Sequence, residues 1–347
     1  MPILSREYNT VDRFLEAVNA RSLGLRIKHY DEWHPELDEA LTVLPEAELL
    51  PHELFRALMV MAEKAKKKII LVTEKGNPVA IAGLRDRWGY WEPVSQWIVP
   101  GVLFPIKEGY LDRVLPALGL RIHIAWWRWQ QPPPQDHWVI NSVSTPTRGM
   151  PLIEDFEAYW RQSSHYRKLR KAQNNCKDFE MKVNPPDGAE LIIKKWEARW
   201  RPKDVVEMPD LKERILVARF LQERGHHHAL LLFNGDEPIA GGTMLIHRNT
   251  AVAHCNFRNQ EYDRNSPMTH LIKLIFIWAK EMGFERIDMG GSFQYKDNWA
   301  PEDGQKWKFD VFPRNKLIKE RMVHTVSNVK NRIWNESLYR PHQYCSK

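Results

Sequence analysis

Residues 251–291 read AVAHCNFRNQEYDRNSPMTHLIKLIFIWAKEMGFERIDMGG, and this one segment predicts a strand, a helix and a second strand. Ala251–Phe257 has the alternation of a strand. Ser266–Met282 predicts a helix, because its first two residues suit the N-cap and first-turn positions and a broad apolar face follows. Gly283 ends that helix, and Arg286–Met289 forms the next strand.

The segments before this unit predict the rest of an α+β layer. We expect antiparallel strands at 229–233 and 239–247, directly before the strand at 251–257. Helices are predicted at 153–175, 189–200 and 211–224, and a short strand at 179–183. An antiparallel meander followed by a helix and a strand is therefore the plan of the second half.

Two segments of the first half repeat segments of the second. Ile70–Gly83 and Leu230–Gly242 both read as a strand, a glycine-containing turn, a proline and a second strand. Leu115–Ile124 and Lys280–Met289 both read as a helix end, a glycine and a strand. The paired prolines are 160 residues apart and the paired glycines 164. Such near-equal offsets indicate a duplicated unit.

A chain of 347 residues suits two domains. Turn-forming residues gather at Ser144–Pro151, so we expect a boundary near 143–152. The predicted organisation is an N-terminal domain at 1–150, a C-terminal domain at 151–313, and a basic helical extension at 314–347. Each domain is expected to hold a mixed, mainly antiparallel sheet flanked by helices.

Composition narrows the class of protein. The net charge of +7 favours anionic partners such as cofactor phosphates or tRNA, and it is equally typical of a solvated basic surface. The three cysteines are widely spaced and indicate neither a disulfide framework nor a zinc site. With no long apolar run and no signal-peptide pattern, we expect a cytoplasmic protein.

The order of several short motifs resembles a known family. Residues 153–313 look like the GNAT-like acyltransferase domain of the BioF2-like group, found in CelD-type proteins and related to the FemAB peptidyltransferases. The matching segments are the basic stretch Tyr166–Lys171, the hairpin Gly235–Gly242, the helix start Asn265–Pro267, the strand end Asp288–Ser292 and the pair Tyr295-Lys296. The first half resembles a degenerate copy, which implies tandem GNAT-like domains.

The resemblance implies an acyltransferase that moves an acyl group from an acyl-CoA or acyl-carrier thioester to an amine of an amino acid, amino sugar or peptide. No tightly bound cofactor, metal or covalent enzyme intermediate is implied. Asp263–Met268 departs from the pattern, because it has no glycine where acetyl-CoA-binding members have a glycine-containing loop. An acyl-carrier protein or an aminoacyl-tRNA therefore remains open as donor. The alternatives are a Fem-like, aminoacyl-tRNA-dependent amide-forming transferase and a non-catalytic RNA- or carrier-binding module.

Three residues are candidates for catalysis. Lys296 matches the lysine of the Fem-type Tyr-Lys pair and could stabilise the oxyanion of acyl transfer, with Tyr295 beside it. His254 has the pKa range of a general base, although a hydrogen-bonded sheet histidine is an equally simple interpretation. The alternative interpretation of Lys296 is an exposed surface lysine with no catalytic role.

Other residues are candidates for binding. Asn256 and Arg258 would share a strand face with His254 and hold a carboxylate or carbonyl of the acceptor. Asp288 could orient an amine or cap a turn, and Ser292 follows it in the strand end. Trp127, in an aromatic run, is either a stacking platform or part of an interface strand.

The donor is expected at the start of the predicted helix, where unpaired N–H groups suit phosphate oxygens. The residues concerned are Asn265, Ser266, Met268, Thr269 and His270. His226–His228 does not predict a metal site, because successive strand residues point to opposite faces.

Overall fold

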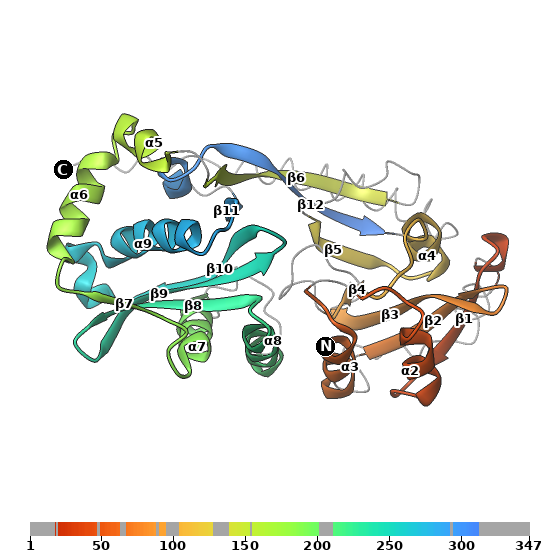
Figure 1. Ribbon diagram of the computed structural model, residues 1–347. Coiled ribbons are helices and arrows are strands. Elements are labelled where there is room, and N and C mark those ends of the chain that lie inside the picture. The colour runs from red at the N-terminus through yellow and green to blue at the C-terminus, as the bar shows by residue number, and fades with distance from the viewer. Residues whose placement is uncertain are drawn as a thin grey trace, which may run out of the picture.

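The computed structural model describes residues 18, 20–46, 49–62, 67–87, 90–94, 104–127, 139–152, 155–200, 211–291 and 294–311. Within these residues the strands form one continuous mixed sheet with helices packed on its faces (Figure 1). The spatial order of the strands is β1 (Arg26–Tyr30), β2 (Lys67–Glu74), β3 (Asn77–Arg87), β4 (Tyr90–Pro93), β5 (Ile122–Trp127), β12 (Glu302–Val311), β6 (Val139–Pro151), β11 (Arg286–Gly291), β10 (Thr250–Arg258), β9 (Glu237–His247), β8 (His227–Asn234) and β7 (Glu180–Val183).

The helices fall into two groups along this sheet. The first half carries α2 (Pro35–Leu41), α3 (His52–Met61) and α4 (Leu111–Ala117). The second half carries α5 (Phe156–Gln162), α6 (Tyr166–Asn175), α7 (Gly188–Trp200), α8 (Leu211–Glu223) and α9 (Pro267–Glu281), with the 3₁₀ turns η3 (Gln260–Asn265) and η4 (Gln294–Asn298). The predicted α+β class is therefore confirmed.

Both predicted hairpins are present, and they share an irregularity. β2 pairs with β3 and β8 with β9, each antiparallel. The register shifts between Val72 and Thr73 in the first hairpin and between Leu232 and Phe233 in the second, which is again an offset of 160 residues. A bulge at the same place in both copies supports the duplication inferred from the sequence.

The turn-forming residues at Ser144–Pro151 do not form a turn, because they belong to β6. β6 lies between β11 and β12 and pairs antiparallel with both. A Cβ atom on Gly149 would lie 2.8 Å from the carbonyl oxygen of Ile287, so the glycine permits close approach to a neighbouring strand instead of forming a turn. Pairing on both sides therefore overrides the local turn propensity.

β12 crosses from the second half to the first. It pairs with β6 on one side and with β5 on the other, and its Phe309 and Val311 are buried in the core of the first half. The last strand that the structure describes thus completes the sheet of the N-terminal half. The first half therefore does not close its core with its own continuous stretch of chain, whereas the main core of the second half is built from residues 150–300.

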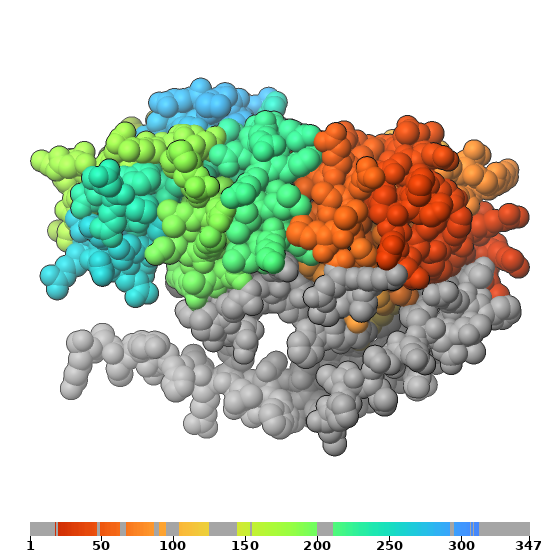
Figure 2. Space-filling model, turned by 90° about the horizontal axis from the view of Figure 1, so that it is seen from below, coloured from red at the N-terminus to blue at the C-terminus, as the bar shows by residue number. Residues whose placement is uncertain are grey.

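Buried charges also join the halves. Arg85 of β3 pairs with Glu92 of β4 at 2.8 Å and with Glu213 of α8 at 2.5 Å, and all three residues are buried. Figure 2 shows the surfaces of the two halves meeting. Arg224 of the second half also pairs with Glu53 of the first at 2.6 Å. Removing Arg85 would leave Glu92 and Glu213 buried without the cation that they share, which is strongly destabilising.

The single helix predicted at 153–175 is two helices. Asp155 caps α5 by accepting hydrogen bonds from the N–H groups of Glu157 and Ala158. Ser163 then takes an extended conformation and ends that helix before α6 begins. The break lets Trp160 of α5 pack edge-on against Phe276 of α9, with ring centroids 5.2 Å apart.

The second half is covered on both faces. α5, α6 and α9 pack over one face through a core that includes Trp160, Phe276 and Trp299. On the other face α7 and α8 enclose a smaller cluster with Ile192 and Phe257. No helix in the described part of the chain has the length and apolar character needed to cross a membrane.

We predict that Phe309→Ala lowers the free energy of unfolding by about 3–5 kcal/mol, because a fully buried aromatic ring leaves a cavity. Hydrogen exchange should accelerate in β4 and β5, although the mutation lies near the end of the described chain. Phe276→Ala is the matched control and should accelerate exchange in α5 and α9 instead. Equal exchange patterns in the two variants would contradict the crossing of β12.

Candidate active site

The site begins where two parallel strands stop pairing. β10 and β11 are paired only from Thr250 to Val252 on one strand and from Arg286 to Asp288 on the other. Beyond this point β10 has an irregular register against β9, and the backbone N–H of Cys255 donates to the Thr243 hydroxyl at 3.0 Å. The Thr243 side chain thus accepts a hydrogen bond from a backbone N–H that has no partner in the interrupted strand pairing.

A cavity of about 60 Å³ opens at this divergence. Its wall comes from β9, β10, the first turns of α9, β11 and η4. The lining residues are Gly242, Thr243, Met244, Ala253, His254, Cys255, Asn256, Met268, Ile272, Ile275, Met289, Tyr295 and Lys296. Five of the residues predicted from the sequence are therefore brought together: His254, Asn256, Met268, Tyr295 and Lys296.

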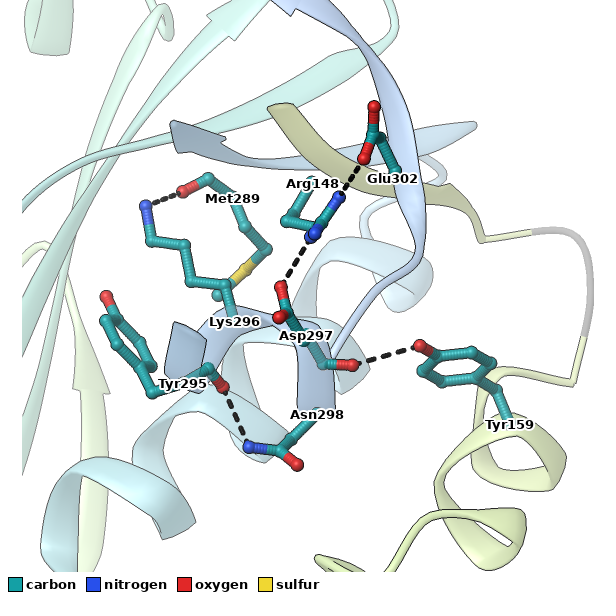
Figure 3. A network of polar contacts seen from close by, with 8 residues as sticks. All are labelled: Arg148, Tyr159, Met289, Tyr295, Lys296, Asp297, Asn298 and Glu302. Atoms are coloured by element: carbon teal, nitrogen blue, oxygen red, sulfur yellow. Dashed lines mark hydrogen bonds and ion pairs between the residues drawn. The ribbon is translucent and has the colours of Figure 1, made fainter. Parts of the chain in front are cut away.

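Lys296 is the buried cation of this cavity. Only 8 % of the residue is exposed, and its Nζ donates to the carbonyl oxygen of Met289 (Figure 3). Gly290 has a φ of +84°, and a Cβ atom there would lie 3.2 Å from Nζ, so this position needs glycine for its backbone and for the space around the ammonium. An ammonium group beside a cavity can stabilise negative charge that develops there.

Tyr295 precedes Lys296 on η4. Although 46 % of the residue is exposed, desolvation raises the pKa of its hydroxyl, and the charge of Arg199 partly offsets this effect. The hydroxyl therefore remains protonated at neutral pH and can donate a proton.

Ion pairs hold η4 in place (Figure 3). The Arg148 guanidinium of β6 contacts Asp297 at 2.6 Å through Nε and Glu302 at 2.9 Å through Nη1. The Tyr159 hydroxyl of α5 donates to the backbone carbonyl of Asp297 at 3.0 Å. The turn that carries the Tyr-Lys pair is thus tied to three elements, and Arg148, which the sequence analysis did not single out, is central to it.

His254 and Cys255 line the cavity, and His227 lies next to His254. His254 is half-buried, and its ring centroid is 6.4 Å from that of His227. Burial lowers the pKa of His227 to about 3. Burial also raises the pKa of the Cys255 thiol, which favours the protonated, unreactive form.

Several predicted residues lie away from the cavity lining. Arg258 is exposed at the end of β10 and pairs with Asp263 at 3.2 Å. Asp288 accepts a hydrogen bond from the N–H of Gly290 at 2.9 Å. This contact matches the turn-capping role, which was the alternative to binding an amine. Ser292 lies outside the described residues, as does the side chain of Trp127, whose backbone in β5 is in register with Trp307.

The start of α9 differs in detail from the expected cap. Ser266 occupies the N-cap position in the left-handed region, with φ +57°, but its side chain caps nothing. Its carbonyl accepts hydrogen bonds from Thr269 and His270 instead. The Asn265 side chain donates to the carbonyl of Asn175 at the end of α6. Of the five donor-site candidates, only Met268 lines the cavity.

His226–His228 behaves as strand alternation predicts. His227 is buried, whereas His228 contacts Asn184 at 3.0 Å and the carbonyl of Gly225 at 3.2 Å. Among the described residues, no group of three or more His, Cys, Asp or Glu side chains is arranged to hold a metal ion.

Comparison with known proteins agrees with this architecture. Residues 161–297, which are less than half of the chain, match the family described as Acetyltransferase (GNAT) domain. No curated protein matches the sequence significantly. Among solved structures, L-PGS from Bacillus licheniformis has 11 % sequence identity and a TM-score of 0.50, with 81 % of this chain and 92 % of that chain covered. At this identity the likeness concerns the fold.

Two further solved structures share the arrangement less closely. FemX has 11 % identity and a TM-score of 0.48, covering 84 % of this chain and 99 % of that chain. A tandem GNAT protein from the clavulanic acid biosynthesis pathway has 11 % identity and a TM-score of 0.42, covering 89 % of this chain and 96 % of that chain.

We predict that His227 makes the protein acid-sensitive. Its pKa is about 3 when folded and 6.5 in the reference state, so the unfolded chain binds more protons between these values and stability falls as pH decreases. The slope should approach about 1.4 kcal/mol per pH unit within this window. Chemical denaturation of His227→Leu at pH 7, 5.5 and 4.5 should show a smaller pH dependence than the parent. If the free energy of unfolding of His227→Leu depends on pH as steeply as that of the parent, another group causes the acid sensitivity.

Proposed function

We propose that the protein is an acyltransferase that moves an acyl group from a thioester to an amine, and that it belongs to the BioF2-like, CelD-type group. The observation that carries this proposal is the cavity where β10 and β11 part, with Lys296 buried in its wall. The presence of a GNAT acetyltransferase domain at 161–297 supports the reaction class. The division into a degenerate domain at 1–150, a catalytic domain at 151–313 and an extension at 314–347 is part of the proposal.

In the proposed reaction the amine nitrogen attacks the thioester carbonyl carbon, a C–N bond forms and the C–S bond breaks. Lys296 stabilises the oxyanion after releasing the Met289 carbonyl. His254 takes the proton that the amine loses, and Tyr295 protonates the departing thiolate. The products are an amide and a free thiol, and the proton held by His254 then returns to the Tyr295 phenolate through solvent. Atoms and charges balance without a covalent enzyme intermediate.

The acceptor is proposed to approach from the side of Asn256, whose amide can bind a carbonyl or carboxylate. The donor is proposed to lie beside the start of α9, with its acyl group against Met268. An amino acid, an amino sugar and a peptide are all acceptors of the required chemistry. A reactive amine must enter unprotonated, which a cavity that already holds an ammonium group favours by repelling the charged form.

We predict that Lys296→Ala lowers turnover by about 10²- to 10³-fold, because an oxyanion-stabilising group is lost. The assay follows thiol release from butyryl-CoA and from a butyryl-loaded acyl carrier protein with amine fractions of a cell extract. The mass of the amide product identifies the acceptor. Lys280→Ala, at the far end of α9, is the control and should retain the parent rate.

The same assay separates the alternatives. Transfer that is abolished by ribonuclease and weakens steeply with salt would favour an aminoacyl-tRNA donor. A protein that binds RNA or a carrier with unchanged affinity after Lys296→Ala, and releases no thiol from any donor, would be a binding module.

We also predict that Arg148→Gln lowers turnover by about tenfold to a hundredfold with a smaller effect on KM, because η4 loses the ion pairs that position Lys296. Arg161→Gln is the matched control, since Arg161 is exposed and its one ion pair among the described residues is with Glu157 of the same helix. A change confined to thermal stability would show that Arg148 is structural only.

A further inference from the structure

Helix α6 has an exposed face made of unpaired basic residues, which we call the basic ridge. The ridge consists of Arg167, Lys168, Arg170 and Lys171 on the helix, Lys177 just after it, and Arg264 of η3. All six are exposed, and none makes an ion pair with any of the described residues. Some other exposed basic side chains of this half do have acidic partners, as Lys194 and Arg219 do with Glu190.

This arrangement works against the stability of the helix itself. Arg167 lies three and four residues before Arg170 and Lys171, and like charges at these spacings repel. The first turn of α6 contains no acidic residue, and cations there are disfavoured by the helix dipole. Leu169, Ala172 and Cys176 form the buried stripe, so the repelling charges all face outward.

The ridge lies beside the donor side of the proposed site. The end of α6 is bonded to the loop before α9, because Asn175 donates to the Arg264 carbonyl and Cys176 to that of Asn265. Met268, three residues after Asn265, lines the cavity. In Figure 1, α6 runs along the outer end of the molecule, next to the start of α9.

The cavity lining and the loop at 263–268 limit which acyl donors the site can accept. The described lining combines apolar side chains with polar ones, among them Lys296 and His254, and it contains no carboxylate. The ammonium of an aminoacyl group would therefore meet a cation and no counter-charge. The loop at 263–268 has no glycine, and the Asn265 side chain is hydrogen-bonded to the end of α6. This loop therefore lacks the glycine that would let a pyrophosphate approach its backbone closely.

We propose that the basic ridge docks a small acidic acyl carrier protein, which delivers its acyl thioester to the cavity. The inference rests on the proposed acyl transfer and names its donor. A ten-residue helix is about 15 Å long, which matches an acidic helix of a small protein. Charge complementarity between two proteins speeds their encounter and fixes their orientation, and an acidic carrier would supply the opposing charges that the described residues do not offer to the ridge.

The test compares two double variants of the full chain that change the net charge equally. Arg167→Glu/Lys171→Glu reverses the ridge, and Lys75→Glu/Lys195→Glu reverses two exposed, unpaired lysines elsewhere. Binding of a butyryl-loaded acyl carrier protein is measured by fluorescence anisotropy at low and high salt. We expect the ridge variant to bind at least about tenfold more weakly and the control as the parent does. Arg167→Gln/Lys171→Gln serves as a milder second variant if the charge reversal impairs folding.

Transfer assays separate this inference from the proposed function. Turnover of butyryl-CoA should be the same in the parent and the ridge variants, whereas turnover of the carrier-bound donor should fall in the variants. Equal use of the carrier-bound donor by all variants would overturn the docking site while leaving acyl transfer intact. Ridge-dependent binding of tRNA in place of the carrier would overturn it in favour of a nucleic acid. Absence of thiol release from both donors in the parent would overturn the proposed function itself.

Discussion

The short parallel ladder between β10 and β11 is the constraint on which the site depends. Three residues of each strand are paired, and beyond them β11 keeps only its pairing with β6 while β10 keeps only its pairing with β9. A continued ladder would fill the space with backbone, whereas a divergence leaves a wedge that side chains can line. Thr243 makes the divergence tolerable, because its hydroxyl satisfies the N–H of Cys255.

The same divergence explains why the site draws on distant parts of the chain. Because β11 continues along β6, the turn η4 that follows β11 comes within reach of Arg148, and the Tyr-Lys pair is held by ion pairs from β6 and β12. β12 in turn completes the core of the first half. The N-terminal half therefore supports the candidate site through shared strands, and the buried pairing of Arg85 with Glu213 adds a second connection.

Much of the local structure could be predicted from the sequence. The helix at α9, the strands on either side of it and both hairpins follow from periodicity and from glycine and proline positions, because these are short-range effects. Ser144–Pro151 does not form the turn that its residue types favour, because a long-range effect outweighs a short-range one there. Turn propensity is a weak local preference, and pairing with two neighbouring strands outweighs it.

The sequence by itself determined the residue types of the site and their local order: a lysine after a glycine-rich strand end, and a helix that starts beside it. The tertiary structure alone decided which of them share a cavity, since it placed Met268 and Asn256 with Lys296 and kept Arg258 and Asp288 out of the lining. It also decided that Arg148 supports the turn carrying Lys296, from 148 positions away. Contacts across such separations depend on strand order and register, which a residue pattern read along one chain does not contain.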